Sequence, residues 1–96
     1  MSVKDAIEFI KQRGGFNSYR ALADAAGVNL RRIDNAVARG SALTASEEAK
    51  LGKAAGMNPV AAVALLEQAY DPATANLWKV FRKLLSAAKP RNRLAA

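Results

Sequence analysis

The chain contains neither cysteine nor histidine in its 96 residues. These absences exclude disulfide bonds, thiolate zinc sites, cysteine nucleophiles and imidazole general bases. No apolar run approaches the roughly 18 residues that a membrane-spanning helix needs, and the N-terminus lacks the basic region and apolar core of a signal peptide. We therefore expect one cytoplasmic domain that is not an enzyme and has no cofactor, metal or small-molecule substrate.

The sequence also lacks the alternation of apolar and polar residues that marks a half-buried strand, which predicts an all-α fold. Capping side chains, glycines and prolines divide the chain into a compact bundle of five to six helices. Their predicted positions are about 3–13, 19–26, 30–39, 45–55, 59–70 and 72–88. We expect four acidic residues to cap helices or lie on solvated faces: Glu47, Glu48, Glu67 and Asp71.

The net charge is +7, and the charges are unevenly distributed. Residues 1–40 hold seven basic and four acidic side chains, and residues 41–75 hold two basic and four acidic ones. Residues 76–96 hold six basic side chains and no acidic one. This balance indicates a polyanionic partner, either nucleic acid or an acidic membrane surface.

The most informative stretch runs from Tyr19 to Arg39 and predicts a short helix, a turn and a second helix. Gly27 lies between the two helices, where positive φ or very close packing requires glycine. Small and aliphatic residues surround it at helical spacing: Leu22, Ala23, Ala26, Val28, Ile33, Ala36 and Val37. A central glycine flanked in this way is typical of a helix-turn-helix motif.

This pattern resembles the lambda-repressor/Cro-like (XRE) helix-turn-helix family of phage repressors and small bacterial regulators. The matching features are Leu22, Ala23, Gly27, Val28, Ile33, the Arg39-Gly40 helix end, the capped helix at 44–55 with Leu51, and the turn at 56–59. The chain departs from the family at residues 29–32, Asn-Leu-Arg-Arg, where Ser, Thr or Gln is usual. The resemblance implies a five-helix, lambda-repressor-like domain at residues 1–70 that binds double-stranded DNA.

The outer face of the helix at about 29–39 predicts the DNA contacts. Arginine matches the two acceptors of guanine, and asparagine matches the acceptor and donor of adenine. The predicted base contacts are Asn29, Arg31, Arg32 and Asn35, and the predicted phosphate contacts are Ser18, Tyr19, Arg20, Arg39 and Ser41. The alternative is a merely solvated face, on which Asp34 pairs with Arg31.

The predicted helix at 72–88 has one apolar and one basic side. It either completes the core, forms a symmetric dimer interface or lies on an anionic membrane, and we consider the membrane the weakest of these alternatives. The dimer would use Leu77, Trp78, Phe81, Leu84 and Leu85. We treat residues 71–90 as this segment and residues 91–96 as a basic, disordered tail.

These features predict a homodimeric transcriptional regulator of phage or mobile-element type, acting as a repressor through sequence-specific DNA binding. The alternative is a phage protein-interaction module whose helix at 72–88 docks a host protein or a membrane surface.

Overall fold

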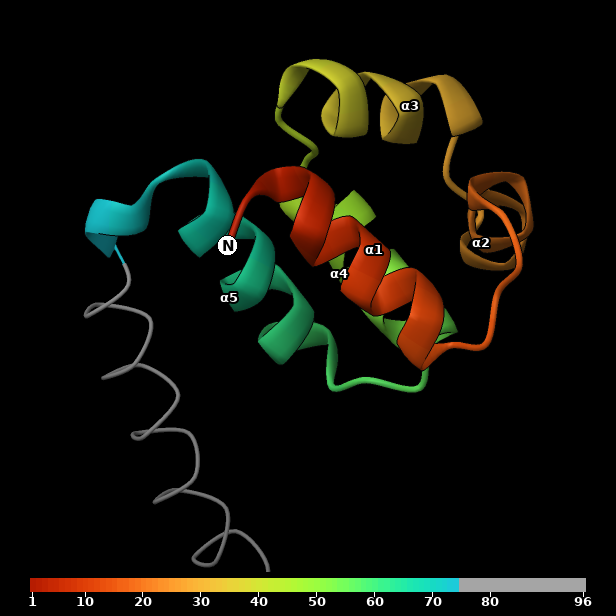
Figure 1. Cartoon of the computed structure of the whole chain (residues 1–96). Coiled ribbons are helices and arrows are strands. Elements are labelled where there is room, and N and C mark those ends of the chain that lie inside the picture. Colours follow the sequence, from red (N-terminus) through yellow and green to blue (C-terminus); the bar gives the residue numbers. More distant parts are fainter. Residues whose placement is uncertain (75–96) are drawn as a thin grey trace, which may run out of the picture.

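The computed structural model describes residues 1–74, and every regular element in this part of the chain is helical. Figure 1 shows the arrangement of its five α-helices. They are α1 (Val3–Arg13), α2 (Tyr19–Ala26), α3 (Leu30–Arg39), α4 (Ala45–Ala54) and α5 (Pro59–Tyr70), followed by a short 3-10 helix, η1 (Pro72–Thr74). The predicted all-α fold class is confirmed for these residues.

Each of the five α-helices begins at a side chain that accepts a backbone N–H from its first turn. These N-caps are Ser2, Ser18, Asn29, Thr44 and Asn58. The hydroxyls of Ser2 and Thr44 form reciprocal capping boxes with the carboxylates of Asp5 and Glu47. The predicted starts of the five helices are confirmed. Helix starts can be predicted from sequence because a cap depends on residues only two or three positions apart.

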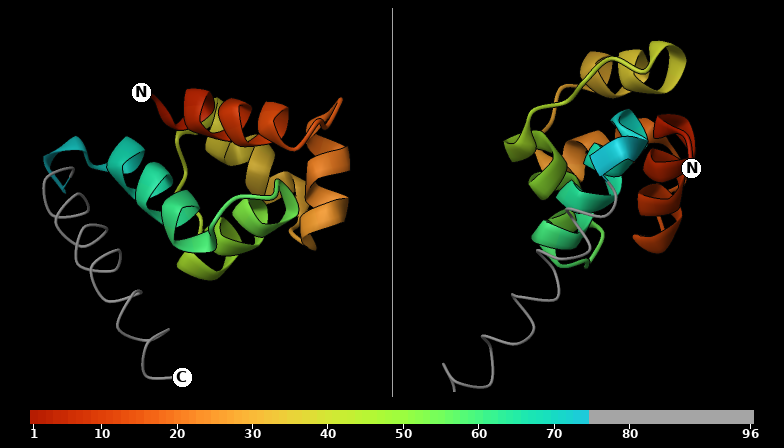
Figure 2. Two further views of the ribbon diagram at one scale, coloured as in Figure 1. Left: turned by 90° about the horizontal axis from the view of Figure 1, so that it is seen from below. Right: turned by 90° about the vertical axis from the view of Figure 1, so that its left-hand side faces the viewer.

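The core forms between α1, α2, α4 and α5, and α3 covers it by packing on α1 and α2. α4 and α5 make the most extensive contact, α1 packs on α5 and α3, and α2 packs on α3 and α4. The large apolar side chains that are fully buried are Ile7, Ile10, Leu22, Ile33, Leu51 and Leu66. In Figures 1 and 2, α3 lies at the edge of this bundle, so that one of its sides remains open.

One prediction about the acidic residues is wrong. Glu48 does not lie on a solvated face but is fully buried in α4. Burial and then the neighbouring carboxyl of Glu67 raise the pKa of Glu48 to about 9. Glu48 is therefore protonated at neutral pH and fills a core position as a neutral group.

Residue 74, at the end of η1, is the last residue that the structure describes. Of the predicted helix at 72–88, only the η1 turn falls within the described residues. The five residues predicted to form a dimer interface, Leu77, Trp78, Phe81, Leu84 and Leu85, lie outside them, as does the predicted tail at 91–96. Within residues 1–74, no helix is long and apolar enough to cross a membrane.

Candidate nucleic-acid interface

The turn between α2 and α3 is fixed by a left-handed glycine. Gly27 has φ of 71°, and a Cβ added there would meet no atom within 4 Å. Glycine is thus required by the backbone conformation and not by close packing. Across this residue the Val28 N–H donates to the Ala23 carbonyl at 3.0 Å, which closes the end of α2. The predicted role of Gly27 as a helix stop is confirmed.

The helix that follows has one buried and one open side. Ile33 and Ala36 are fully buried, and Leu30 and Val37 pack against the core at its margin. On the other side Arg31 and Arg39 are exposed, and Asn35 is partly exposed. This division follows from the 100° advance per residue, which places the side chains of residues 31 and 35 next to each other on one face.

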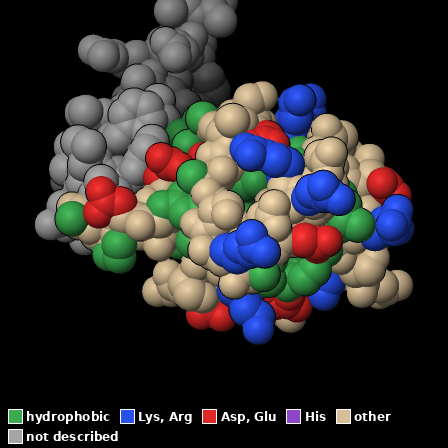
Figure 3. All heavy atoms as spheres, turned by 90° about the horizontal axis from the view of Figure 1, so that it is seen from above, with side chains coloured by type: hydrophobic (Ala, Val, Ile, Leu, Met, Phe, Trp, Pro, Cys, Tyr) green, Lys and Arg blue, Asp and Glu red, His purple; other side chains and the backbone are tan. Residues whose placement is uncertain are grey.

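Arg31, Asn35 and Arg39 have no side-chain partner among residues 1–74. The ion pair between Arg31 and Asp34 that a solvated face predicts does not form. Figure 3 shows the face of the molecule that carries α3, where Lys and Arg side chains are interspersed with acidic ones. A ligand of this face would therefore displace no hydrogen bond or ion pair that these three side chains make within residues 1–74.

The N-terminus of α2 offers a second set of donors. Ser18 is exposed, and its oxygen accepts the Ala21 N–H at 3.0 Å, which leaves its hydroxyl hydrogen free to donate. Arg20 is exposed in the first turn and has no partner in the described part of the chain. The first N–H groups of a helix have no acceptor within it and carry a partial positive charge, so this end suits a phosphate.

Tyr19 requires a correction, because its hydroxyl is already used within the protein. It donates a 2.6 Å hydrogen bond to the Glu8 carboxylate on α1, and the Lys11 ammonium lies 5.3 Å from its ring centre. Hydrogen bonds from Tyr19, Gln12 and Lys11 hold the pKa of Glu8 at about 2, and burial with the Glu8 bond raises the pKa of Tyr19 to about 12. Tyr19 therefore fixes α2 on α1 and does not present a hydroxyl to phosphate.

Arg32 is also engaged within the protein. Its Nη2 and Nε donate to the two oxygens of Glu47 at 2.8 and 3.1 Å, and Nη2 reaches the Ala42 carbonyl at 3.4 Å. This bidentate pair raises the pKa of Arg32 and is the main cause that holds the pKa of Glu47 at about 2. A base contact from Arg32 would break these bonds, so we assign it to the junction of α3 and α4.

The loop between α3 and α4 is also held by a side chain from α5. The Tyr70 hydroxyl, at the end of α5, accepts the Leu43 N–H at 2.9 Å and donates to the Ser41 carbonyl at 3.2 Å. Ser41 remains exposed beside the end of α3, and its predicted phosphate contact stays a prediction. Asn29 is different, since its side-chain oxygen accepts the Arg31 N–H at 2.8 Å and only its amide hydrogens remain for DNA.

These contacts were not predictable from the chain alone, because each joins residues that lie far apart in the sequence. Three sets of contacts hold α2, α3 and their neighbours in place: Glu8 with Tyr19, Arg32 with Glu47, and Tyr70 with residues 41 and 43.

Residues 1–74 contain no group of three His, Cys, Asp or Glu side chains that could hold a metal ion. Comparisons of the chain with protein-family models, curated proteins and solved structures find no match.

Proposed function

We propose that the protein is a lambda-repressor-like DNA-binding regulator, with α3 in the major groove and the N-terminus of α2 on the phosphate backbone. The observation that carries the proposal is the open face of α3. It presents Arg31, Asn35 and Arg39, which have no side-chain partner among residues 1–74, next to a glycine turn and the exposed first turn of α2.

The polar contacts around this face support the proposal through pre-organisation. A reading helix discriminates bases only if its side chains are held in a fixed position, because each base contact depends on bidentate geometry. The Glu8–Tyr19 pair joins α2 to α1, and the Arg32–Glu47 pair joins α3 to α4. The net charge of +7, of which +6 lies in residues 76–96, supplies the sequence-independent attraction to phosphate.

The test is selection of binding sites from a random duplex library, followed by affinity measurements on selected and scrambled sites. We expect Arg31→Ala and Asn35→Ala each to reduce the preference for the selected site by about 1–3 kcal/mol, or roughly 5- to 150-fold. Arg13→Ala, an exposed arginine at the end of α1, is the matched control and should leave the preference unchanged.

A phosphate contact gives a different result from a base contact. Arg20→Ala should weaken binding to all sequences alike and lower the slope of log affinity against log salt by about 1. If the unchanged protein binds every duplex equally, or if Arg31→Ala and Asn35→Ala keep the full preference, α3 does not read DNA. That result would favour the alternative function, a module that binds another protein or a membrane surface.

A further inference from the structure

The connection between α3 and α4, residues 40–44, has no helix or strand of its own. Its first two N–H groups donate back to carbonyls of α3, at 2.9 and 3.4 Å. From the Ser41 carbonyl to the Leu43 N–H, its hydrogen bonds are instead made with side chains of α3 and α5. A backbone segment without regular structure depends on such partners for its conformation, because each of its polar groups has to be satisfied separately.

Tyr70 holds this connection from the end of α5. Its hydroxyl accepts the Leu43 N–H at 2.9 Å and donates to the Ser41 carbonyl at 3.2 Å, so the group is used both as acceptor and as donor. We call these two bonds the Tyr70 clamp. Between them, Arg32 Nη2 donates to the Ala42 carbonyl at 3.4 Å. Burial raises the pKa of Tyr70, which keeps the hydroxyl hydrogen in place to donate.

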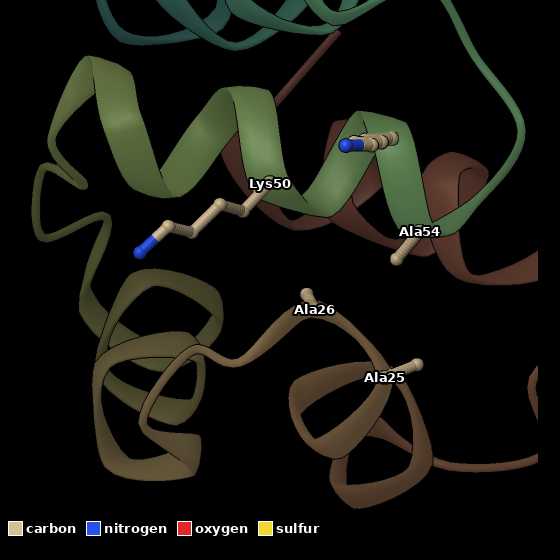
Figure 4. A pocket seen from close by; sticks show the side chains of 5 residues that line it. Ala25, Ala26, Lys50 and Ala54 are labelled. Carbon is tan, nitrogen blue, oxygen red and sulfur yellow. The ribbon is translucent and has the colours of Figure 1, made fainter.

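The two helices of the helix-turn-helix are held on α4 and α5 in different ways. α2 packs on α4 directly, and Figure 4 shows Ala26, at the end of α2, directed toward α4. α3 packs mainly on α1 and α2. Its ties to α4 and α5 are polar, namely the Arg32–Glu47 pair in its first turn and the Tyr70 clamp just beyond its last residue. The clamp therefore fixes the end of α3 that packing secures least.

Two predicted phosphate contacts lie at this end. Arg39 is the last residue of α3, Ser41 is the residue whose carbonyl Tyr70 binds, and both are exposed. We propose that Tyr70 is a positioning residue for DNA binding, which holds Arg39 and Ser41 in place through the backbone of residues 41–43 without contacting DNA itself. A segment that is already ordered loses less conformational freedom on binding, which raises affinity. This inference rests on the proposed function and deepens it.

The test is a double-mutant cycle on a duplex that the unchanged protein binds. Tyr70→Phe keeps the ring and removes both hydrogen bonds of the clamp, and it should weaken DNA binding at least about threefold. In an Arg39→Ala/Ser41→Ala background the same change should weaken binding no further, because the contacts that Tyr70 positions are already absent. A general loss of stability would instead act alike in both backgrounds. Gln68→Ala, at a partly exposed position on α5, is the control and should leave the affinity unchanged.

Amide hydrogen exchange of the full chain without DNA measures the clamp separately. Tyr70→Phe should speed exchange of the Leu43 N–H at least about tenfold more than that of Leu51, which is buried in α4. The inference is overturned if Leu43 and Leu51 respond alike, if Tyr70→Phe keeps the full DNA affinity, or if its effect is as large in the Arg39→Ala/Ser41→Ala background. An unchanged protein that binds no duplex overturns the proposed function together with the positioning role, and this result is recognised without any Tyr70 variant.

Discussion

Glu48 is an ionisable side chain that lies in the core of the protein. It is fully buried, next to the carboxyl of Glu67 and close to Tyr70 on α5 and to Glu47 on its own helix. An ionised carboxylate in this position would face the carboxyl groups of two other glutamates. The protein therefore holds Glu48 protonated, which makes its stability depend on pH.

The sign of this dependence follows from the raised pKa. In the unfolded chain Glu48 ionises near its ordinary value of 4.5, whereas in the folded protein it stays protonated up to about pH 9. The contribution of Glu48 to stability is thus fully present below pH 4.5 and is lost progressively as the pH rises toward 9.

Replacing the carboxyl by its neutral isostere removes this loss. We expect Glu48→Gln to match the unchanged protein near pH 4 and to exceed its Tm at pH 8 by about 4 °C or more, the shift for roughly 1 kcal/mol in a small domain. Thermal unfolding followed by circular dichroism at both pH values measures the difference. Asp24→Asn, at an exposed position on α2, is the control. An equal Tm difference at pH 4 and pH 8 would contradict the assignment.

Only some residues of the candidate site could be placed correctly from the sequence. The helical period alone placed Ile33 and Ala36 inside and Arg31 outside, because position along a helix determines direction. It did not show that Tyr19 and Arg32 bind Glu8 and Glu47, since these partners are 11 and 15 residues away and meet only in the folded chain. The predicted contacts of these two residues required revision for that reason.

Among the elements, the contact between α4 and α5 depends on a glycine inside a helix. Gly52 is buried in α4, and a Cβ added to it would collide with the Cβ of Ala62 on α5. Glycine at this position costs helix propensity but lets the two backbones approach closely. The sequence indicates the ends of both helices and gives no sign of this contact, because Gly52 stands where no turn is needed.

This contact predicts the effect of adding one methyl group. Gly52→Ala should lower stability by about 1–3 kcal/mol through overpacking, which exceeds the gain of about 1 kcal/mol in helix propensity. Gly52→Ala/Ala62→Gly moves the methyl group to the other helix and should recover much of the loss. Urea denaturation of the three proteins measures these differences. A Gly52→Ala variant that is more stable than the unchanged protein would show that α4 and α5 can separate at no cost.

At the scale of the whole molecule, the proposed DNA face of a single copy of this chain is small, because one short helix and the first turn of another form it. Helix-turn-helix proteins commonly bind as two-fold dimers that place two reading helices about 34 Å apart on one side of the duplex. The sequence at 77–88 supplies an apolar side for such pairing, with Trp78 and Phe81 on it, although these residues lie outside the described part of the chain. We therefore propose that the regulator is a homodimer and that specificity depends on the distance between its two α3 helices.

Sedimentation of the full chain tests this proposal. The unchanged protein should sediment as a dimer, and Trp78→Asp/Phe81→Asp should sediment as a monomer with unchanged helical content, because two buried carboxylates on each copy would oppose pairing. Lys79→Ala/Lys83→Ala changes the basic side of the same predicted helix and should remain dimeric. The monomeric variant should also bind one half-site as well as two, which removes the preference for an inverted repeat. An unchanged protein that stays monomeric at high concentration, with and without its DNA site, would contradict the dimer, and a variant that loses its helical content would assign this side of the helix to the core.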